Sequence, residues 1–240
     1  MQDKAKNMSD LKKAFSDLKN GEFILIYDSD GRERETDLII ASEFMTAEGV
    51  KRQRKDAGGL ICTSAPSRMW KKLDLPFMAE LLAECYNAHP VLKGLAPNDL
   101  VYDTKSSFSL TINHRKTFTG IPDADRALTI SEFAKFGKKC DSMNEAEARE
   151  EFGKYFRAPG HVHLLNSQPG VLDDRAGHTE LCTAMLMMAD MFPSATMCEI
   201  MGDNGRSMPK EETMKYAEKN GLVFLEGSDI IDAWNKRDKD

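Results

Sequence analysis

Apolar positions along this chain follow two patterns, which predict strands and helices in mixed order. Short runs of mostly apolar residues are typical of buried strands, and strict alternation of apolar and polar residues is typical of half-buried strands. Residues 107–114 alternate, with Phe108, Leu110 and Ile112 on one face. The other predicted strands are the apolar runs at residues 22–27, 38–42, 60–64, 162–167, 195–201 and 222–225.

Apolar residues at helical spacing lie between these runs. Ser9 is placed to cap a first helix in which Leu11, Phe15 and Leu18 share one face, and Gly21 ends it. A second apolar stripe predicts a helix that starts near Thr179. That stripe consists of Leu181, Met185, Met188 and Phe192. Further helices are predicted at residues 47–56, at 131–136 from Ser131, between Pro209 and Asn220, and from Ser228 onward.

Strands and helices of these kinds are mixed along the whole sequence. No internal repeat or low-complexity linker divides it. We therefore expect an α+β fold, in which residues 1–240 form a single compact domain with a mixed sheet and flanking helices. The order of the strands in the sheet does not follow from the sequence.

Composition excludes several classes of partner. The 240 residues are 41% hydrophobic and carry a formal net charge of −6, without a dominant basic stripe, which disfavours nucleic acid. No apolar run approaches the ~20 residues of a membrane span. The charged N-terminus has no signal-peptide core, and the five cysteines are odd in number and scattered. We expect reduced thiols in a cytoplasmic protein.

An acidic segment follows directly after the first predicted strand. Residues 28–37 contain five acids together with Arg32 and Arg34. Carboxylates at this density suit a hard cation such as Mg²⁺, and an arginine offers charge to an anionic substrate. The alternative is a solvated charged turn, which is the commoner meaning of such a run.

A second candidate site lies at the start of the helix near Thr179. Arg175, the backbone around Gly177, and Thr179 are placed to hold a phosphate, since a helix N-terminus offers free N–H donors. His178 lies in the same turn and is a candidate metal ligand. The alternative is an ordinary capped helix start with a surface histidine.

Single polar residues beside apolar strands complete the set of candidates. Glu199 lies between apolar residues, and a desolvated carboxylate there becomes a competent general base. The alternative places Glu199 on the solvent face of an edge strand. His161 follows a Pro-Gly pair and His163 comes two residues later, so that spacing alone does not choose between them as a proton shuttle.

Five motifs together resemble one family, 3,4-dihydroxy-2-butanone 4-phosphate synthase. Each motif alone is weak, but their order along residues 10–225 is specific. They are R-E-x-E-x-D from Arg32, T-G-I from Thr119 followed by D-x-D-R from Asp123, P-G-H-V from Pro159, R-x-G-H-T-E from Arg175, and C-E from Cys198 followed by G-D-N-G.

The resemblance implies a lyase of riboflavin biosynthesis. Such an enzyme converts D-ribulose 5-phosphate to L-3,4-dihydroxy-2-butanone 4-phosphate and formate, uses two Mg²⁺ (or Mn²⁺) ions per site, and is a homodimer with active sites near the interface. It also implies a monofunctional chain without a fused GTP cyclohydrolase II domain. The implied metal ligands are Glu33 and His178; the implied substrate contacts are Arg32, Glu33, Asp37, Thr119, Arg175, Ala176, Gly177, His178, Thr179 and Glu199; and the implied catalytic residues are His161, Glu199, Asp37 and Cys62.

Some alternatives stay open on the sequence alone. Glu199 is our candidate for the base, with Asp37 as its main competitor. Thr119 lines the same pocket in this hypothesis, in one version from the other subunit. A different magnesium-dependent isomerase or hydrolase of a sugar phosphate, or a non-catalytic binding module, would use the same phosphate site without releasing formate.

Overall fold

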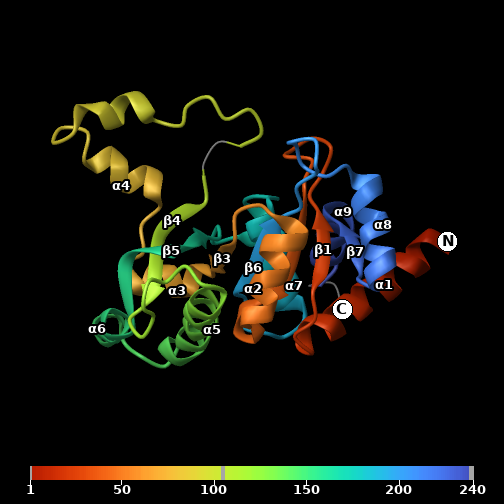
Figure 1. Cartoon of the computed structure of the whole chain (residues 1–240), viewed down its shortest axis with the longest axis horizontal. Coiled ribbons are helices and arrows are strands. Elements are labelled where there is room, and N and C mark those ends of the chain that lie inside the picture. The colour runs from red at the N-terminus through yellow and green to blue at the C-terminus, as the bar shows by residue number, and fades with distance from the viewer. Residues whose placement is uncertain (1, 104–105, 238–240) are drawn as a thin grey trace.

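One seven-stranded mixed sheet runs through the molecule in our computed structural model, which describes residues 2–103 and 106–237 (Figure 1). The strand order is β4-β5-β3-β6-β2-β1-β7. Two pairs, β1–β7 and β3–β5, are parallel, and the other pairs are antiparallel. The strands are β1 (Ile24–Tyr27), β2 (Thr36–Ala41), β3 (Cys62–Ala65), β4 (Phe108–His114), β5 (Phe156–Asn166), β6 (Ala195–Glu199) and β7 (Phe224–Glu226).

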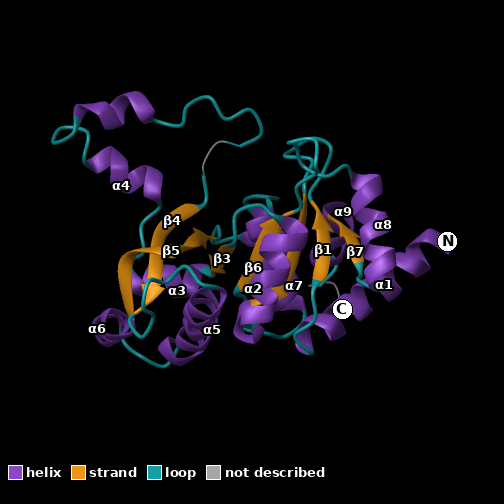
Figure 2. Cartoon of the chain, in the orientation of Figure 1, coloured by secondary structure: helices purple, strands orange, loops and turns teal. Residues whose placement is uncertain are grey.

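Helices cover both faces of this sheet (Figure 2). One layer contains α1 (Gln2–Lys19), α7 (His178–Met188) and α9 (Gly227–Trp234), and the other contains α2 (Ala47–Arg52), α3 (Ser67–Leu73), α5 (Asp123–Cys140), α6 (Glu145–Tyr155) and α8 (Lys210–Asn220). No described helix is both long and apolar enough to cross a membrane.

Each central strand supplies side chains to two cores. Leu25 packs with the α2–α5 side, whereas Ile24 and Ile26 pack with the α7 side, and all three are fully buried. Successive strand residues point to opposite faces, so a strand covered on both sides needs apolar side chains on both faces. This explains the continuous apolar runs in the sequence and confirms the predicted α+β class with a mixed sheet and flanking helices.

The predicted strands all occur, but some predicted boundaries are wrong. The first helix begins at Gln2, so Ser9 is inside it and does not cap it. The helix predicted from Ser131 begins at Asp123, after Pro122, where two acids in the first turn favour the helix dipole. The strand predicted at 162–167 begins at Phe156. The stripe residue Phe192 lies beyond the end of α7.

Two segments contain helices that the sequence patterns did not predict. Residues 145–155 form α6, capped by Asn144, whose side chain accepts the Glu147 N–H. Residues 77–103, called the arm below, leave the sheet through α4 (Met78–Glu84) and a 3-10 helix (Pro90–Leu95), and the described end of the arm returns toward β4 (Figure 1). That residues 1–240 form a single domain stays a prediction.

Candidate active site

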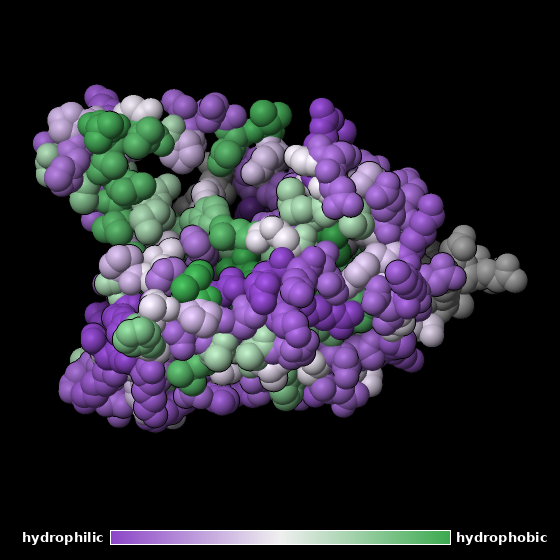
Figure 3. Space-filling view, in the orientation of Figure 1, coloured by the Kyte–Doolittle hydropathy of each residue, from purple (hydrophilic) through white to green (hydrophobic). Residues whose placement is uncertain are grey.

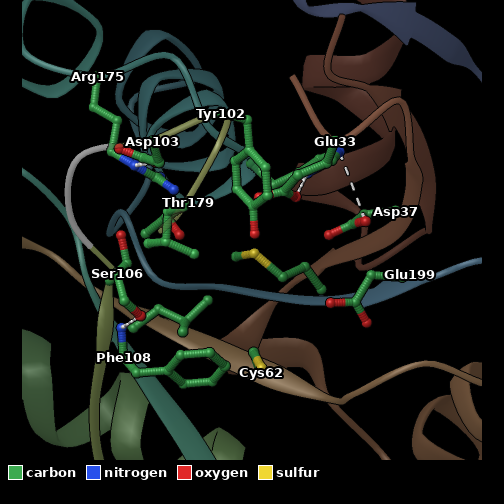
Figure 4. Close-up of a pocket in the computed structure, with 15 residues that line it drawn as sticks. Glu33, Asp37, Cys62, Tyr102, Asp103, Ser106, Phe108, Arg175, Thr179 and Glu199 are labelled. Carbon is green, nitrogen blue, oxygen red and sulfur yellow. Dashed lines mark hydrogen bonds and ion pairs between the residues drawn. The ribbon is translucent and has the colours of Figure 1, made fainter. Parts of the chain in front are cut away.

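A pocket of about 200 Å³ opens where the acidic segment, the start of α7 and the end of the arm meet (Figure 4). This volume is below the roughly 300 Å³ at which pockets for drug-sized ligands begin. It therefore suits a small metabolite. The lining residues are Glu33, Asp37, Cys62, Leu100, Tyr102, Asp103, Ser106, Ser107, Phe108, Leu165, Arg175, His178, Thr179, Met197 and Glu199.

The sheet places three of these side chains by simple alternation. Ile39 and Met197 belong to the core under α7. Asp37 and Glu199 lie two positions away on the same strands and are register partners, so both face the α7 side. Cys62 belongs to the same core and pairs with Met197. The pocket therefore lies on the sheet face that α7 covers.

The acidic segment, which connects β1 to β2, is held by one of its own acids. Asp28 is buried, and its two carboxylate oxygens accept the N–H groups of Glu33 at 2.8 Å and Glu35 at 3.1 Å. Arg34 adopts a left-handed backbone with φ of 61°, and its exposed side chain donates to the Asp30 carbonyl. This turn directs Glu33 into the pocket and Arg34 away from it.

His178, the first residue of α7, meets that segment from the other side. Its Nε2 lies 3.2 Å from the Ile26 carbonyl oxygen, which can only accept, so Nε2 carries a proton. Its Nδ1 lies 3.5 Å from a Glu33 carboxylate oxygen. A histidine that ligates a metal commonly donates its other ring N–H to a backbone carbonyl. His178 is therefore oriented to offer Nδ1 to an ion beside Glu33.

Excess negative charge in this corner shifts the ionisation of its members. Burial would lower the pKa of His178, but the charge of Asp37 and a hydrogen bond to Glu33 outweigh it and raise that pKa. Burial raises the pKa of Asp37; the charge of His178 opposes this shift, and the carboxylates of Glu199 and Glu33 add to it. The shift of His178 reflects the carboxylates around it, and negative charge of this kind favours binding of a positive ion.

The donor set fits a hard divalent cation. One ligand atom each from Asp28, Glu33 and His178 can lie within 4.8 Å of the others. Both Asp28 oxygens already accept backbone N–H groups, which leaves Glu33 and His178 as the better placed ligands. Mg²⁺ is typically held by one or two protein carboxylates, with water and substrate completing its shell.

Arg175 lies at the opposite wall of the pocket, beside Asp103 (Figure 4). A second acid, Glu180, also pairs with it. The Nη1 of Arg175 donates to Glu180, which is fully buried, and its Nε donates to Asp103 of the arm. A side chain at Gly177 would collide with this guanidinium, since its Cβ would lie 2.2 Å from Nη1. The glycine thus lets Arg175 fold back over the start of α7, where an anion can reach both the guanidinium and the helix terminus.

Glu199 and Cys62 complete the floor of the pocket. Glu199 ends β6, an interior strand of the sheet, so the edge-strand alternative is wrong. Its Oε2 accepts the Leu60 N–H at 2.7 Å. Burial, with help from nearby carboxylates, raises the pKa of the Cys62 thiol well above its ordinary value. Cys62 is therefore an uncharged thiol.

The structure brings together most, but not all, of the candidates from the sequence. Seven line the pocket, namely Glu33, Asp37, Cys62, Arg175, His178, Thr179 and Glu199. Arg32 is not in the lining, but its guanidinium pairs with Asp103, which is. The lining of this pocket does not include Ala176, Gly177, Thr119 or His161. The sequence analysis missed Tyr102 and Asp103, because nothing in the arm's sequence distinguishes them from other loop residues.

Thr119 and His161 form a second group, called the β4–β5 cluster together with Asn113 and Gly120. Asn113 links the group: its Oδ1 accepts the His161 N–H at 2.9 Å, and its Nδ2 lies 3.1 Å from His161 Nδ1 and 3.3 Å from the Thr119 carbonyl oxygen. Gly120 has φ of 91° and no room for a Cβ beside Asn113. Both Thr119 and His161 are exposed.

His163 occupies a different environment from His161. It pairs with Cys62 in the sheet and packs edge-on against Phe108, with ring centroids 6.2 Å apart. Burial lowers the pKa of His163, which keeps it neutral. His161 has the freer access to a second molecule, whereas His163 supports the pocket wall.

Comparison with known proteins identifies the family of this chain. A family model described as 3,4-dihydroxy-2-butanone 4-phosphate synthase matches residues 12–233. The chain belongs to this family. It is 43% identical to the synthase of Methanothermobacter thermautotrophicus, over 93% of this chain and 95% of that one. It is 45% identical to the synthase of Methanosarcina acetivorans, over 93% and 90% of the two chains.

Solved synthase structures have the same fold. One, of 3,4-dihydroxy-2-butanone 4-phosphate synthase in complex with two magnesium ions, superimposes with a TM-score of 0.71 at 25% identity, over 95% of this chain and 97% of that one. The Candida albicans synthase gives a TM-score of 0.69 at 26% identity, over 92% and 95% of the two chains. The family resemblance read from the five motifs is confirmed.

Proposed function

We propose that this chain converts D-ribulose 5-phosphate to L-3,4-dihydroxy-2-butanone 4-phosphate and formate, as a lyase of riboflavin biosynthesis. One observation carries the proposal: Glu33 and the turn that holds Arg175 and His178, which lie far apart in sequence, border one small pocket. Membership of the synthase family supplies the reaction class.

Arg175 and Arg32 bind the phosphate in this proposal. Both guanidinium groups reach the same point at the pocket wall, because both donate to Asp103. Thr179 lies beside them at the start of α7 and offers a hydroxyl. Charge-assisted hydrogen bonds from two guanidinium groups fix the phosphate in orientation as well as in position. The sugar then extends toward Glu33 and Glu199.

Glu33 and His178 hold the metal in this proposal. The solved synthase structure in complex with two magnesium ions supports Mg²⁺ and a count of two. When bound, a divalent ion stabilises the negative charge that develops on the sugar oxygens. The Asp28 carboxylate holds Glu33 by accepting the Glu33 backbone N–H. The Ile26 carbonyl oxygen holds the His178 ring by accepting its Nε2–H.

Glu199 removes the C3 proton of the sugar, with Asp37 as the competing base. The two carboxylates are neighbours on adjacent strands and both point into the pocket (Figure 4). Glu199 Oε2 is held by the Leu60 N–H, whereas Asp37 lies within 3.6 Å of the His178 ring. The difference suits Glu199 to transfer protons and Asp37 to orient His178. Cys62 lies on the same sheet face as a neutral thiol.

A base assignment is testable by hydrogen exchange. We expect Glu199→Gln to abolish exchange of the substrate C3 proton with solvent deuterium, measured by NMR, while Asp37→Asn retains some exchange. The opposite pattern would make Asp37 the base. Binding of inorganic phosphate, which neither acid contacts in this proposal, checks that each variant keeps a folded anion site.

A second copy of the chain completes the site in this proposal. Thr119 and His161 are outside the pocket lining, yet the family resemblance makes His161 a catalytic residue and Thr119 a substrate contact. Exposed apolar side chains flank them: Phe118 is 93% and Ile121 51% exposed. Figure 3 shows further apolar surface gathered on the arm, where Val91, Leu95 and Val101 are exposed. Such surface is typical of an interface.

A homodimer would therefore bring His161 of one copy to the pocket of the other. His161 is then the proton shuttle, and Asn113 holds its ring. The D-x-D-R motif supports this cluster, because Asp125 accepts the Gly120 N–H and Asp123 pairs with Arg54 and Arg126.

All five cysteines are unpaired, which suits the cytoplasm.

The decisive experiment measures formate. Incubation with ribulose 5-phosphate and Mg²⁺ should release one formate per substrate consumed, and EDTA should stop the reaction until Mg²⁺ is restored. Consumption without formate would instead favour a magnesium-dependent isomerase or hydrolase of a sugar phosphate. Substrate binding without turnover would favour a binding module.

A further inference from the structure

Asp103 neutralises both arginines of the phosphate site at once. Its Oδ2 accepts hydrogen bonds from Nη2 of Arg32 at 2.9 Å and from Nε of Arg175 at 2.5 Å. All three side chains are largely buried, with exposed fractions of 9%, 17% and 13%. Partial burial would raise the pKa of Asp103, but a hydrogen bond from Arg32 and the charge of Arg175 outweigh it and lower that pKa. The carboxylate is therefore ionised where a phosphate would bind.

The two acids beside Arg175 differ in how they are held. Glu180 belongs to α7 itself, is 0% exposed, and also accepts the Gln168 N–H. Asp103 comes from the end of the arm, 72 positions away in sequence (Figure 4). Glu180 is thus a partner from α7 that orients the guanidinium, whereas Asp103 reaches it from a separate segment.

We propose that Asp103 is a specificity-determining residue, an internal carboxylate that phosphate must displace from Arg32 and Arg175. The inference rests on the proposed function, because it takes these two arginines as the phosphate site. Only ligands with a phosphate group gain enough binding free energy from the two arginines to displace the Asp103 carboxylate. A sugar without phosphate is therefore excluded.

Charge and geometry explain why phosphate wins this exchange. Asp103 serves both guanidinium groups with a single oxygen. A phosphate dianion has more charge and three terminal oxygens, so each arginine can gain its own acceptor. The displaced carboxylate returns to water. Since the free site is occupied by its own acid for part of the time, the apparent affinity for any anion is reduced by the fraction of competent molecules.

The test measures binding of inorganic phosphate by isothermal titration calorimetry to the full-length protein. We expect Asp103→Asn and Asp103→Ala to lower the dissociation constant about three- to tenfold, because the competitor is gone. The Michaelis constant for ribulose 5-phosphate should fall in parallel. Asp99→Asn, an exposed acid of the same segment, is the matched control for net charge and should bind phosphate as the wild type does.

The outcomes separate the inference from the proposed function. Phosphate affinity that is unchanged or weaker in both Asp103 variants, while Arg175→Ala abolishes binding, overturns the role of Asp103 and leaves the phosphate site intact. A merely structural role of Asp103 would give this weaker binding. If Arg175→Ala binds phosphate as well as the wild type does, the proposed phosphate site and the inference both fail.

Discussion

The pocket and the β4–β5 cluster contain candidate residues of the same kinds in opposite environments. In the pocket, Glu33, His178 and Arg175 have charged partners, and each is largely shielded from water. In the cluster, His161 and Thr119 are exposed, and Asn113 holds them from below. One region is closed by the chain itself, and the other presents its chemistry outward.

This difference indicates how the work of the site is divided. Charges that must bind a metal and a phosphate need a preorganised, water-poor environment, which the sheet and α7 supply within one chain. A histidine that acts on a neighbouring molecule has to stay accessible until that molecule arrives. In the proposed dimer, the exposed cluster is the half of the site that a second copy uses.

The largest effect is expected in the pocket. Glu33→Gln should lower kcat by about 10²–10³, the range seen when one preorganised charge-stabilising group is removed. The metal loses a charged ligand, while the loop keeps its Asp28 contacts through the backbone. Formate release at saturating Mg²⁺ measures this. Glu48→Gln, an exposed acid outside the pocket, should behave as the wild type, and equal losses in both variants would contradict the assignment.

Mixing two inactive variants examines whether the halves come from different copies. Glu33→Gln and His161→Ala chains, each inactive alone, should regain roughly a quarter of wild-type activity when co-refolded in equal amounts, because half the dimers are mixed and each has one intact site. Formate release again gives the readout. Mixing Glu33→Gln with Arg175→Ala should restore nothing, since both changes lie in the pocket. No recovery in the first mixture would place His161 in its own chain's site.

The affinity of the pocket for a divalent ion should depend on pH. The charge of Asp37 and the hydrogen bond to Glu33 outweigh burial and raise the pKa of His178, so the metal-free ring holds a proton at neutral pH that an ion must displace. Apparent Mn²⁺ affinity should therefore increase with pH, by up to about tenfold per unit. Calorimetry between pH 6.5 and about 8.5, in buffers of different ionisation enthalpy, counts the released proton. A flat profile would remove His178 from the ligand set.

The smallest effect is expected at the support of the cluster. Asn113→Ala removes the groups that hold His161 and the Thr119 carbonyl, and should lower kcat about tenfold with little change in KM, since phosphate binding lies elsewhere. A rise in KM without loss of kcat would show that Asn113 serves binding instead. Asn220→Ala, an exposed asparagine on α8, is the control for the substitution itself.

Local patterns were sufficient for much of the fold. Apolar runs predicted six strands of the described sheet, and alternation predicted β4. A strand covered on both faces needs apolar side chains on each of them, which makes such strands easy to recognise. The ends of elements were less predictable. Ser131 has the features of a cap, yet it lies within α5 and its hydroxyl bonds back to the Leu128 carbonyl. A local capping signal and the longer apolar stripe can indicate different starting residues for a helix, and packing decides where the helix begins.

The sequence by itself determined the kinds of residue in the site and their family, because Glu33, Arg175, His178 and Glu199 lie in motifs whose chemistry is local. Only the tertiary structure decided which of them meet. Alternation on three strands put Asp37, Cys62 and Glu199 on the α7 side, and the arm brought Asp103 to arginines about seventy positions away. Contacts between distant segments depend on how the sheet is ordered, and strand order is not written in any single stretch of the chain.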